Sequence, residues 1–229
     1  METIILDSIP FTLSAGNLPG LKSITGKGGY FDKVAALVDQ ARALGRPKAM
    51  YRPTYIDEKG EDFIVIGGTK LASRVLRVNT GEAYRVFPFA ATCGRELDDW
   101  ANSLDDMFDR YVADIINQTV LRSAVTALKS HLKEKYALPK ISQMNPGSLE
   151  NWPLSEQDQL FKILGGTSTD IGVELNSSCA MTPKMSVSGV CFPSEHSFEN
   201  CQLCPRENCP GRRAPYDKGL YESRYRQAT

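Results

Sequence analysis

The sequence predicts an α+β fold, in which helices flank a central antiparallel sheet and one helix is long. Two observations lead to this fold class. Short runs of alternating apolar residues, separated by turn residues, recur through the first part of the chain and are typical of strands. A broad apolar stripe at helical spacing then runs from Phe108 to Leu132. We expect the helix that carries this stripe to be the buried spine of the fold.

Residues 1–92 are expected to form an N-terminal α/β part of the same domain. Apolar residues at helical spacing predict a helix at residues 31–44, and Gly45 suits the position after its end. Two apolar runs on either side of a charged turn predict a β-hairpin. The strands expected here are residues 3–6, 48–56, 63–66 and 83–91, and a second, short helix is expected at residues 71–78.

Residues 93–190 contain the long helix, which is expected to run from about residue 94 to Tyr136 with a break near residues 102–103. Asp105 and Asp106 suit the start of its main part, because acidic side chains stabilise the positive end of a helix dipole. A shorter helix is expected to end near Leu164. The strands expected in this part are residues 173–175 and 186–190.

The composition excludes several classes of partner. The chain has 229 residues, with 27 Lys and Arg against 27 Asp and Glu. This balance gives no electrostatic reason to expect binding to nucleic acid or to an anionic membrane. No apolar stretch approaches the length of a membrane span, and the short apolar run at the N-terminus soon meets Asp7. We therefore expect a cytoplasmic protein.

The third part, residues 191–229, contains a dense array of cysteines. Cys201, Cys204 and Cys209 stand in a C-x2-C-x4-C pattern, and Cys191 precedes them. Four thiolates this close in sequence can bind one metal centre, and proline follows two of them, as it follows the last ligand of some iron–sulfur motifs. The sequence therefore predicts a metal-binding loop with Cys191, Cys201, Cys204 and Cys209 as ligands.

The spacing leaves the identity of the metal open. A [4Fe-4S] cluster needs four thiolates and tolerates varied spacing between them. A structural zinc ion would use the same four cysteines, or three of them with His196. Disulfide bonds would need an oxidising compartment, of which the sequence gives no sign. Cys179 is a reserve ligand in case Cys191 points away. Arg212 and Arg213, which follow the array, could offset the negative charge of a cluster or meet an acidic partner.

The second half of the chain resembles the activation (reactivation) domain of vitamin B12-dependent methionine synthase and the free-standing proteins similar to it. The resemblance covers about residues 94–193. It rests on a long helix followed in order by the loop Asn145-Pro146-Gly147, the step Trp152-Pro153 that opens a helix, the turn Met181-Thr182-Pro183, and the strand Ser186-Val187-Ser188-Gly189.

The resemblance implies a C-shaped α+β domain that binds S-adenosylmethionine in a shallow groove. Such a domain docks over a corrinoid cofactor carried by a partner module. One electron and a methyl group from S-adenosylmethionine then return inactive Co(II) to methylcobalt. The groove residues that the resemblance implies are Gln143, Asn145, Pro146, Gly147, Ser148, Ser186, Ser188 and Gly189.

Two of these positions differ from the family pattern. Gln143 stands where the family has an arginine that holds the methionine carboxylate, and Ser148 stands where it has an aromatic residue. Lys140 could supply the missing positive charge, and a solvated lysine is the alternative interpretation. The cysteine array is a further departure, because the methionine synthase domain takes its electron from a separate flavoprotein.

Together, the cysteines and the resemblance predict an iron–sulfur protein that reductively activates a corrinoid protein or methyltransferase. Iron–sulfur potentials reach about −700 mV, which is low enough in principle to reduce cobalt. Such chemistry suits anaerobic metabolism. The alternative is a non-catalytic, zinc-stapled adaptor or binding domain for a corrinoid protein. No catalytic residue is predicted, because neither His131 nor His196 has a Ser or Cys partner at a recognisable spacing.

Overall fold

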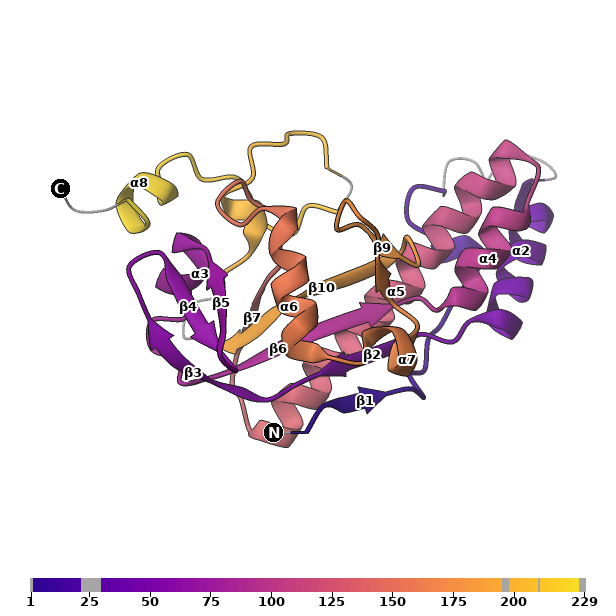
Figure 1. The fold of residues 1–229 in the computed structure, drawn as a ribbon. Helices are drawn as coiled ribbons and strands as arrows, with labels where there is room; N and C mark the ends of the chain where they lie inside the picture. The colour runs from indigo at the N-terminus through magenta and orange to yellow at the C-terminus, as the bar shows by residue number, and fades with distance from the viewer. Residues whose placement is uncertain (1, 22–29, 195–197, 210, 227–229) are drawn as a thin grey trace.

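An antiparallel sheet of eight strands forms the centre of the protein, with helices on both of its faces (Figure 1). The structure is a computed structural model that describes residues 2–21, 30–194, 198–209 and 211–226. The strands of the sheet are β1 (Ile4–Leu6), β2 (Lys48–Tyr51), β3 (Thr54–Lys59), β4 (Phe63–Ile66), β5 (Thr69–Ala72), β6 (Arg85–Thr92), β7 (Ile141–Met144) and β10 (Ser186–Pro193). A separate ribbon pairs β8 (Glu174–Leu175) with β9 (Met181–Thr182). The predicted α+β class is confirmed.

Strand β6 organises the sheet because it is paired along both edges. One edge pairs with β10, from Thr92 opposite Ser186 to Phe87 opposite Cys191. Two strands share the other edge of β6. Strand β2 pairs with the second half of β6, and β3 pairs with the first residues of β6. The chain passes from β2 to β3 through Pro53, which has no N–H to donate to a ladder. From this shared edge the sheet continues to β1 through β2, and to β5 through β3 and β4.

The helices differ widely in length. They are α2 (Tyr30–Leu44), α3 (Arg74–Asn79), α4 (Arg95–Ser103), α5 (Met107–Tyr136), α6 (Gln157–Leu164), α7 (Thr167–Ile171) and α8 (Leu220–Arg224), with 3-10 turns η1 (Ala15–Asn17), η2 (Leu154–Glu156) and η3 (Asn200–Gln202). Helix α5 has 30 residues, and a helix of that length spans about 45 Å. Within the described ranges, no helix combines the length and the apolarity that a bilayer crossing requires.

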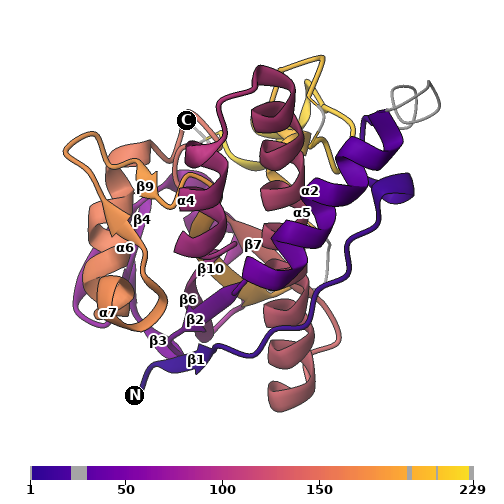
Figure 2. The same ribbon diagram turned by 90° about the vertical axis from the view of Figure 1, so that its right-hand side faces the viewer.

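Helix α5 is the spine of the fold, as predicted, and its two halves pack differently. The first half, including Ile116 and Val120, packs against α2 and α4 (Figure 2), in an arm beyond the end of the sheet (Figure 1). The second half, including Leu128 and Leu132, packs on the face of the sheet that carries Phe87 and Phe89. The opposite face is covered by α6 and α3, around Trp152 and other buried apolar residues.

The largest differences from the predicted elements lie in short strands. Residues 69–72 form β5, so the helix predicted at residues 71–78 begins only at Arg74, where Ser73 accepts a hydrogen bond from the Leu76 backbone N–H. Strand β7 was not among the strands expected from the sequence, because the stretch between the long helix and Trp152 is polar. Among the described residues β7 pairs with β10 alone, so it is an edge strand of the sheet. Its polar Ser142 and Gln143 are nevertheless buried, and Ser142 accepts a hydrogen bond from the Phe198 backbone N–H of the C-terminal tail. Polarity therefore concealed a buried edge strand.

Candidate functional site

The C-terminal tail, residues 198–226, is fixed to the sheet domain near both of its ends. The Phe198 backbone N–H donates to Ser142 Oγ at 3.0 Å, and the Phe198 ring is buried. At the other end Tyr225 is buried, and its hydroxyl donates to Asn79 Oδ1 at 2.9 Å. The two rings lie 6.3 Å apart in one apolar cluster. The described part of the tail is therefore anchored at both ends.

The start of the tail also docks on α5. Glu199 forms a capping box with Gln202 at η3 and an ion pair with Arg213, at 2.9 Å. Lys129 of α5 lies near both Glu199 and Arg213. Burial lowers the pKa of Lys129, and the neighbouring Glu199 opposes that shift. Charged groups of η3 and α5 thus meet where the cysteine array begins.

The cysteine loop, residues 201–209 and 211–213, contains three of the four predicted metal ligands. The side chains of Cys201, Cys204 and Cys209 are all half-buried and unbonded to other cysteines. The Arg213 backbone N–H points at Cys201 Sγ from 3.4 Å. Hydrogen bonds to the ligand sulfur atoms are a usual feature of cysteine metal sites. The three cysteine side chains of the loop are therefore of a type that binds metals.

The fourth predicted ligand, Cys191, lies elsewhere. It is fully buried in β10, in the apolar cluster between the sheet and α5. Burial raises the pKa of its thiol to about 12, despite the opposing effect of the Lys129 ammonium. Among the described residues, no three Cys, His, Asp or Glu side chains gather closely enough to hold a metal ion. The structure therefore gathers neither Cys191 with the loop cysteines nor the thiols of Cys201, Cys204 and Cys209 with one another as closely as a bound metal requires.

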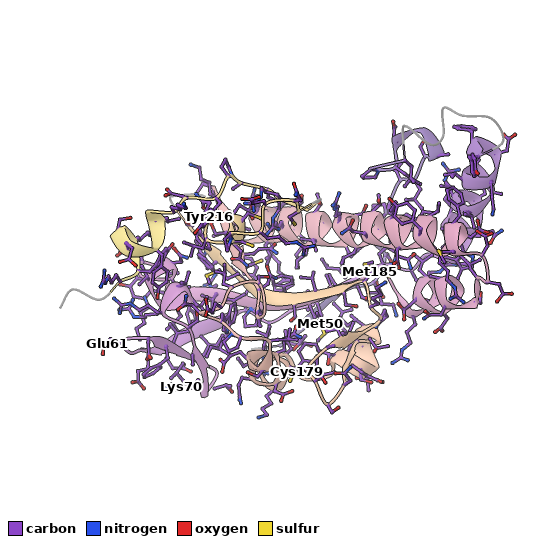
Figure 3. All side chains as sticks on the ribbon, turned by 90° about the horizontal axis from the view of Figure 1, so that it is seen from above. Met50, Glu61, Lys70, Cys179, Met185 and Tyr216 are labelled. Atoms are coloured by element: carbon purple, nitrogen blue, oxygen red, sulfur yellow. The ribbon has the colours of Figure 1, made fainter. Side chains whose placement is uncertain are left out.

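The other predicted sulfur and imidazole ligands are also outside the loop. Cys179 follows β8 at the tip of the β8–β9 ribbon, beside α6 and away from Tyr216 of the tail (Figure 3). His196 lies outside the described residues. Cys93 is buried in the apolar cluster around α2, α4 and α5, which is the ordinary environment of an inert cysteine.

Three of the predicted groove residues face α5. Gln143 lies opposite Cys191 in the register of β7 and β10. Its side-chain amide donates to Asn145 Oδ1 at 3.1 Å, and Asn145 Nδ2 donates to the Ser188 carbonyl at 2.7 Å. Both amides are almost completely buried, and the Asn145 side chain covers Gly189. This chain of hydrogen bonds fixes the end of β7 to β10.

Ser186 and Ser188 belong to a different polar network. The Ser188 hydroxyl donates to Gln157 Oε1 at 2.6 Å, and the Gln157 amide donates to the Cys179 carbonyl. The Ser186 hydroxyl donates to Thr92 Oγ1 at 2.9 Å. Ser188 and Gln157 are both buried, so this network ties β10 to α6 and to the β8–β9 ribbon.

The remaining groove residues form a turn beside a cavity. Gly147 has a φ of 76°, which favours glycine, and its N–H donates to the Trp152 carbonyl at 2.7 Å. After Pro146 and Gly147, Ser148 lines a cavity of about 540 Å³. The opposite wall of this cavity belongs to the tail and includes Cys204 and Tyr216. The structure thus brings one predicted groove residue and one predicted metal ligand to the same cavity.

Tyr216 and Tyr221 line the same cavity and were not among the residues predicted from the sequence. Both line the 540 Å³ cavity, and the Tyr221 hydroxyl donates to Asn151 Oδ1 at 3.1 Å across it. The sequence held one indirect indication of them. Ser148 stands where the family pattern has an aromatic residue, so an aromatic residue from another segment could have been sought. Lys140, considered as a replacement cation, lines a second cavity of about 740 Å³, together with Tyr84 and Arg224.

Comparison with solved structures identifies the architecture. The chain superposes on the structure described as "Crystal Structure of the MetH Reactivation Domain bound to AdoHcy" with a TM-score of 0.64 and 15% sequence identity. The match covers 87% of this chain and 80% of that one. The chain has the fold of the MetH reactivation domain. No family model and no curated protein sequence matches it. The resemblance that the sequence suggested is confirmed at the level of the fold.

Proposed function

We propose that this protein takes part in the activation of a corrinoid-dependent methyltransferase, with a metal centre in its cysteine loop as the carrier of one electron. The observation that carries the proposal is the likeness of fold to the MetH reactivation domain over most of both chains. The structure of that domain holds AdoHcy. By analogy, we propose a ligand of the S-adenosylmethionine type for this chain, and a corrinoid protein as its partner.

In the proposed reaction, one electron reduces the Co(II) corrinoid of the partner to Co(I). Co(I) then takes the methyl group of S-adenosylmethionine, which leaves as S-adenosylhomocysteine. The methyl transfer needs no proton donor or acceptor, so the contribution of this chain is to bind and orient the reactants. This agrees with a sequence in which we predicted no catalytic acid, base or nucleophile.

The 540 Å³ cavity is the proposed ligand site. Its volume falls within the usual range for small-molecule sites, about 300–1,000 Å³. The rings of Tyr216 and Tyr221 offer surfaces for an adenine, while Glu150 and Lys218 offer opposite charges to an amino and a carboxylate group. Gln143 and Asn145 are buried, so their side chains are not available to a ligand. We therefore expect the ligand contacts to come from the tail side of the cavity.

The metal would be held by Cys201, Cys204 and Cys209. When bound, an iron–sulfur cluster would supply a one-electron donor at low potential. Cys191 and the identity of the metal stay predictions, and the complete burial of Cys191 argues against its role as the fourth ligand. A structural zinc ion in the same loop is the alternative, which would make the protein a zinc-stapled binding domain.

The first test is the metal content and visible spectrum of protein purified without oxygen. We expect iron and acid-labile sulfide, and a broad visible absorption that dithionite bleaches. The double variant C201S/C204S should lose both, whereas C93S should keep them. One zinc ion and a colourless solution would exclude the electron-carrier role. The second test is loss of Co(II) corrinoid absorption when the reduced protein is mixed with a corrinoid protein and S-adenosylmethionine.

A further inference from the structure

Arg212 contacts the backbone of all three loop cysteines. Its guanidinium donates to the carbonyl of Cys201 at 3.0 Å and to the carbonyl of Cys204 at 3.1 Å. Its own backbone N–H donates to the carbonyl of Cys209 at 3.1 Å. Two further carbonyls, of Ala214 at 3.2 Å and of Arg206, also accept from the guanidinium. One residue thus joins the three segments that carry the thiols.

An arginine suits this position better than any other side chain. Its guanidinium holds five N–H donors in a rigid plane, so it can serve several carbonyls that converge from different directions. A lysine ammonium carries one charge on one nitrogen, with three donors, and cannot span the same set of acceptors. Hydrogen bonds from a charged donor are also stronger than those between neutral groups.

The arrangement leaves the thiols available. Among the described residues, every acceptor of the Arg212 guanidinium is a backbone carbonyl, and none is a cysteine sulfur. The contact made to a sulfur in this segment comes from the next residue, since the Arg213 backbone N–H faces Cys201 Sγ. Arg212 therefore holds the backbone of the loop and leaves the three thiols unbonded, so that a metal could draw the sulfur atoms together by side-chain rotation.

We propose that Arg212 is the positioning residue of the cysteine loop, holding the backbones of Cys201, Cys204 and Cys209 in place for one metal ion or cluster. This inference rests on the proposed function in one respect, namely that the loop binds a metal. It adds that the loop is ordered before the metal arrives, and that the ordering depends on one side chain. The electrostatic role that the sequence suggested for Arg212 is then secondary to a geometric one.

The test uses Co²⁺ as the probe, with the full chain in metal-free form under reducing conditions. The thiolate-to-Co²⁺ charge-transfer band reports both the affinity for Co²⁺ and the number of thiolates bound to it. Residues that orient metal ligands typically cost about 10–100-fold in affinity when replaced. We expect R212K to lose that much affinity for Co²⁺ and to show a weaker charge-transfer band per bound Co²⁺ ion. The matched control is R206K, which changes an exposed arginine of the same loop and should bind as the wild type does.

Two further measurements separate positioning from a general effect on folding. The thermal midpoint of metal-free R212K should equal that of the wild type, because the loop cysteines lie outside the apolar clusters. Hydrogen exchange of the amides at residues 204, 212 and 213 should be faster in metal-free R212K than in R206K. If R212K and R206K had equal Co²⁺ affinity, charge-transfer absorption and hydrogen exchange, the role of Arg212 would be overturned, while the proposed metal site would stand. A wild type that takes up no Co²⁺ would overturn the proposed metal site, and the role of Arg212 with it.

Discussion

Asn145 occupies the space that a side chain at position 189 would need. A Cβ atom at Gly189 would lie 2.7 Å from Asn145 Nδ2 and 2.2 Å from the Met144 carbonyl. The same amide donates to the carbonyl of Ser188, the residue before this glycine. The glycine of the Ser-Val-Ser-Gly strand is thus required by close packing of β7 on β10.

The variant G189A tests this contact. We expect it to lose about 1–3 kcal/mol of unfolding free energy, because overpacking moves a backbone carbonyl that has no room to relax. Urea unfolding measures the loss. The control is G16A, where a Cβ would meet nothing within 4 Å. Equal stability of G189A and the wild type would show that β7 shifts freely.

The bond between Ser188 and Gln157 gives a second prediction. In S188A, Gln157 Oε1 loses its donor within a buried site, and an unsatisfied buried acceptor costs about 1–3 kcal/mol. The double variant S188A/Q157L should lose less stability than the sum of the losses in S188A and Q157L, because the bond from Gln157 to the Cys179 carbonyl is lost equally in both Q157L variants. Urea unfolding of the single and double variants measures the coupling. Strict additivity of the two changes would argue against a direct interaction.

The buried thiols predict how stability depends on pH. Burial raises the pKa of both Cys93 and Cys191 from 9.0 to about 12 in the folded protein. In the unfolded chain these thiols ionise near the ordinary value, while in the folded protein they stay protonated. Their contribution to stability is complete below pH 9 and is lost as the pH rises from 9 to 12, by up to about 1.4 kcal/mol per pH unit for each thiol.

Urea unfolding between pH 8 and 10.5 checks that slope, with other groups controlled by comparison of variants. C191A should lose stability less steeply with pH than the wild type, as should C93A. Alkylation of the metal-free protein at pH 8 gives an independent check, since the three half-buried loop cysteines should react well before Cys191. Rapid alkylation of Cys191 would mean that β10 opens readily beneath α5.

The cavity walls predict the effect of Tyr216 on ligand binding. If S-adenosylhomocysteine stacks on this ring, Y216L should weaken its binding about 2–10-fold, in line with the usual contribution of an aromatic pair. Isothermal titration calorimetry measures the change. Y84L is the matched control, because Tyr84 is 82% exposed and lines the other cavity. Equal losses in the two variants would exclude the 540 Å³ cavity as the site.

The spine and its partners could be predicted from the sequence because their signals are local. The apolar stripe from Phe108 to Leu132 marks α5, and short apolar runs mark β4 and β6. Strand β7 could not be predicted in this way. Its Ser142 and Gln143 are buried, Ser142 bonds to the distant Phe198, and Gln143 pairs with the distant Cys191, and sequence polarity shows no such partners.

The candidate site was predictable only in its residue types. The cysteine spacing indicated a metal, yet it could not show that Cys191 lies beneath α5, because alternation along β10 decides which face each residue takes. Likewise, the role of Arg212 depends on how the loop folds back, and nothing in the spacing of Arg212 from each cysteine encodes that path.

The anchoring of the tail at Phe198 and Tyr225 has a consequence for damage and repair. Oxygen destroys exposed iron–sulfur clusters, and a domain held together by its cluster would unravel when this happens. Here the apolar contacts on either side of the cysteine loop do not involve the thiols. If the loop holds such a cluster, its loss would leave both anchors and the Arg212 hydrogen bonds of the loop backbone in place, so the emptied protein would stay folded and could be reloaded rather than replaced.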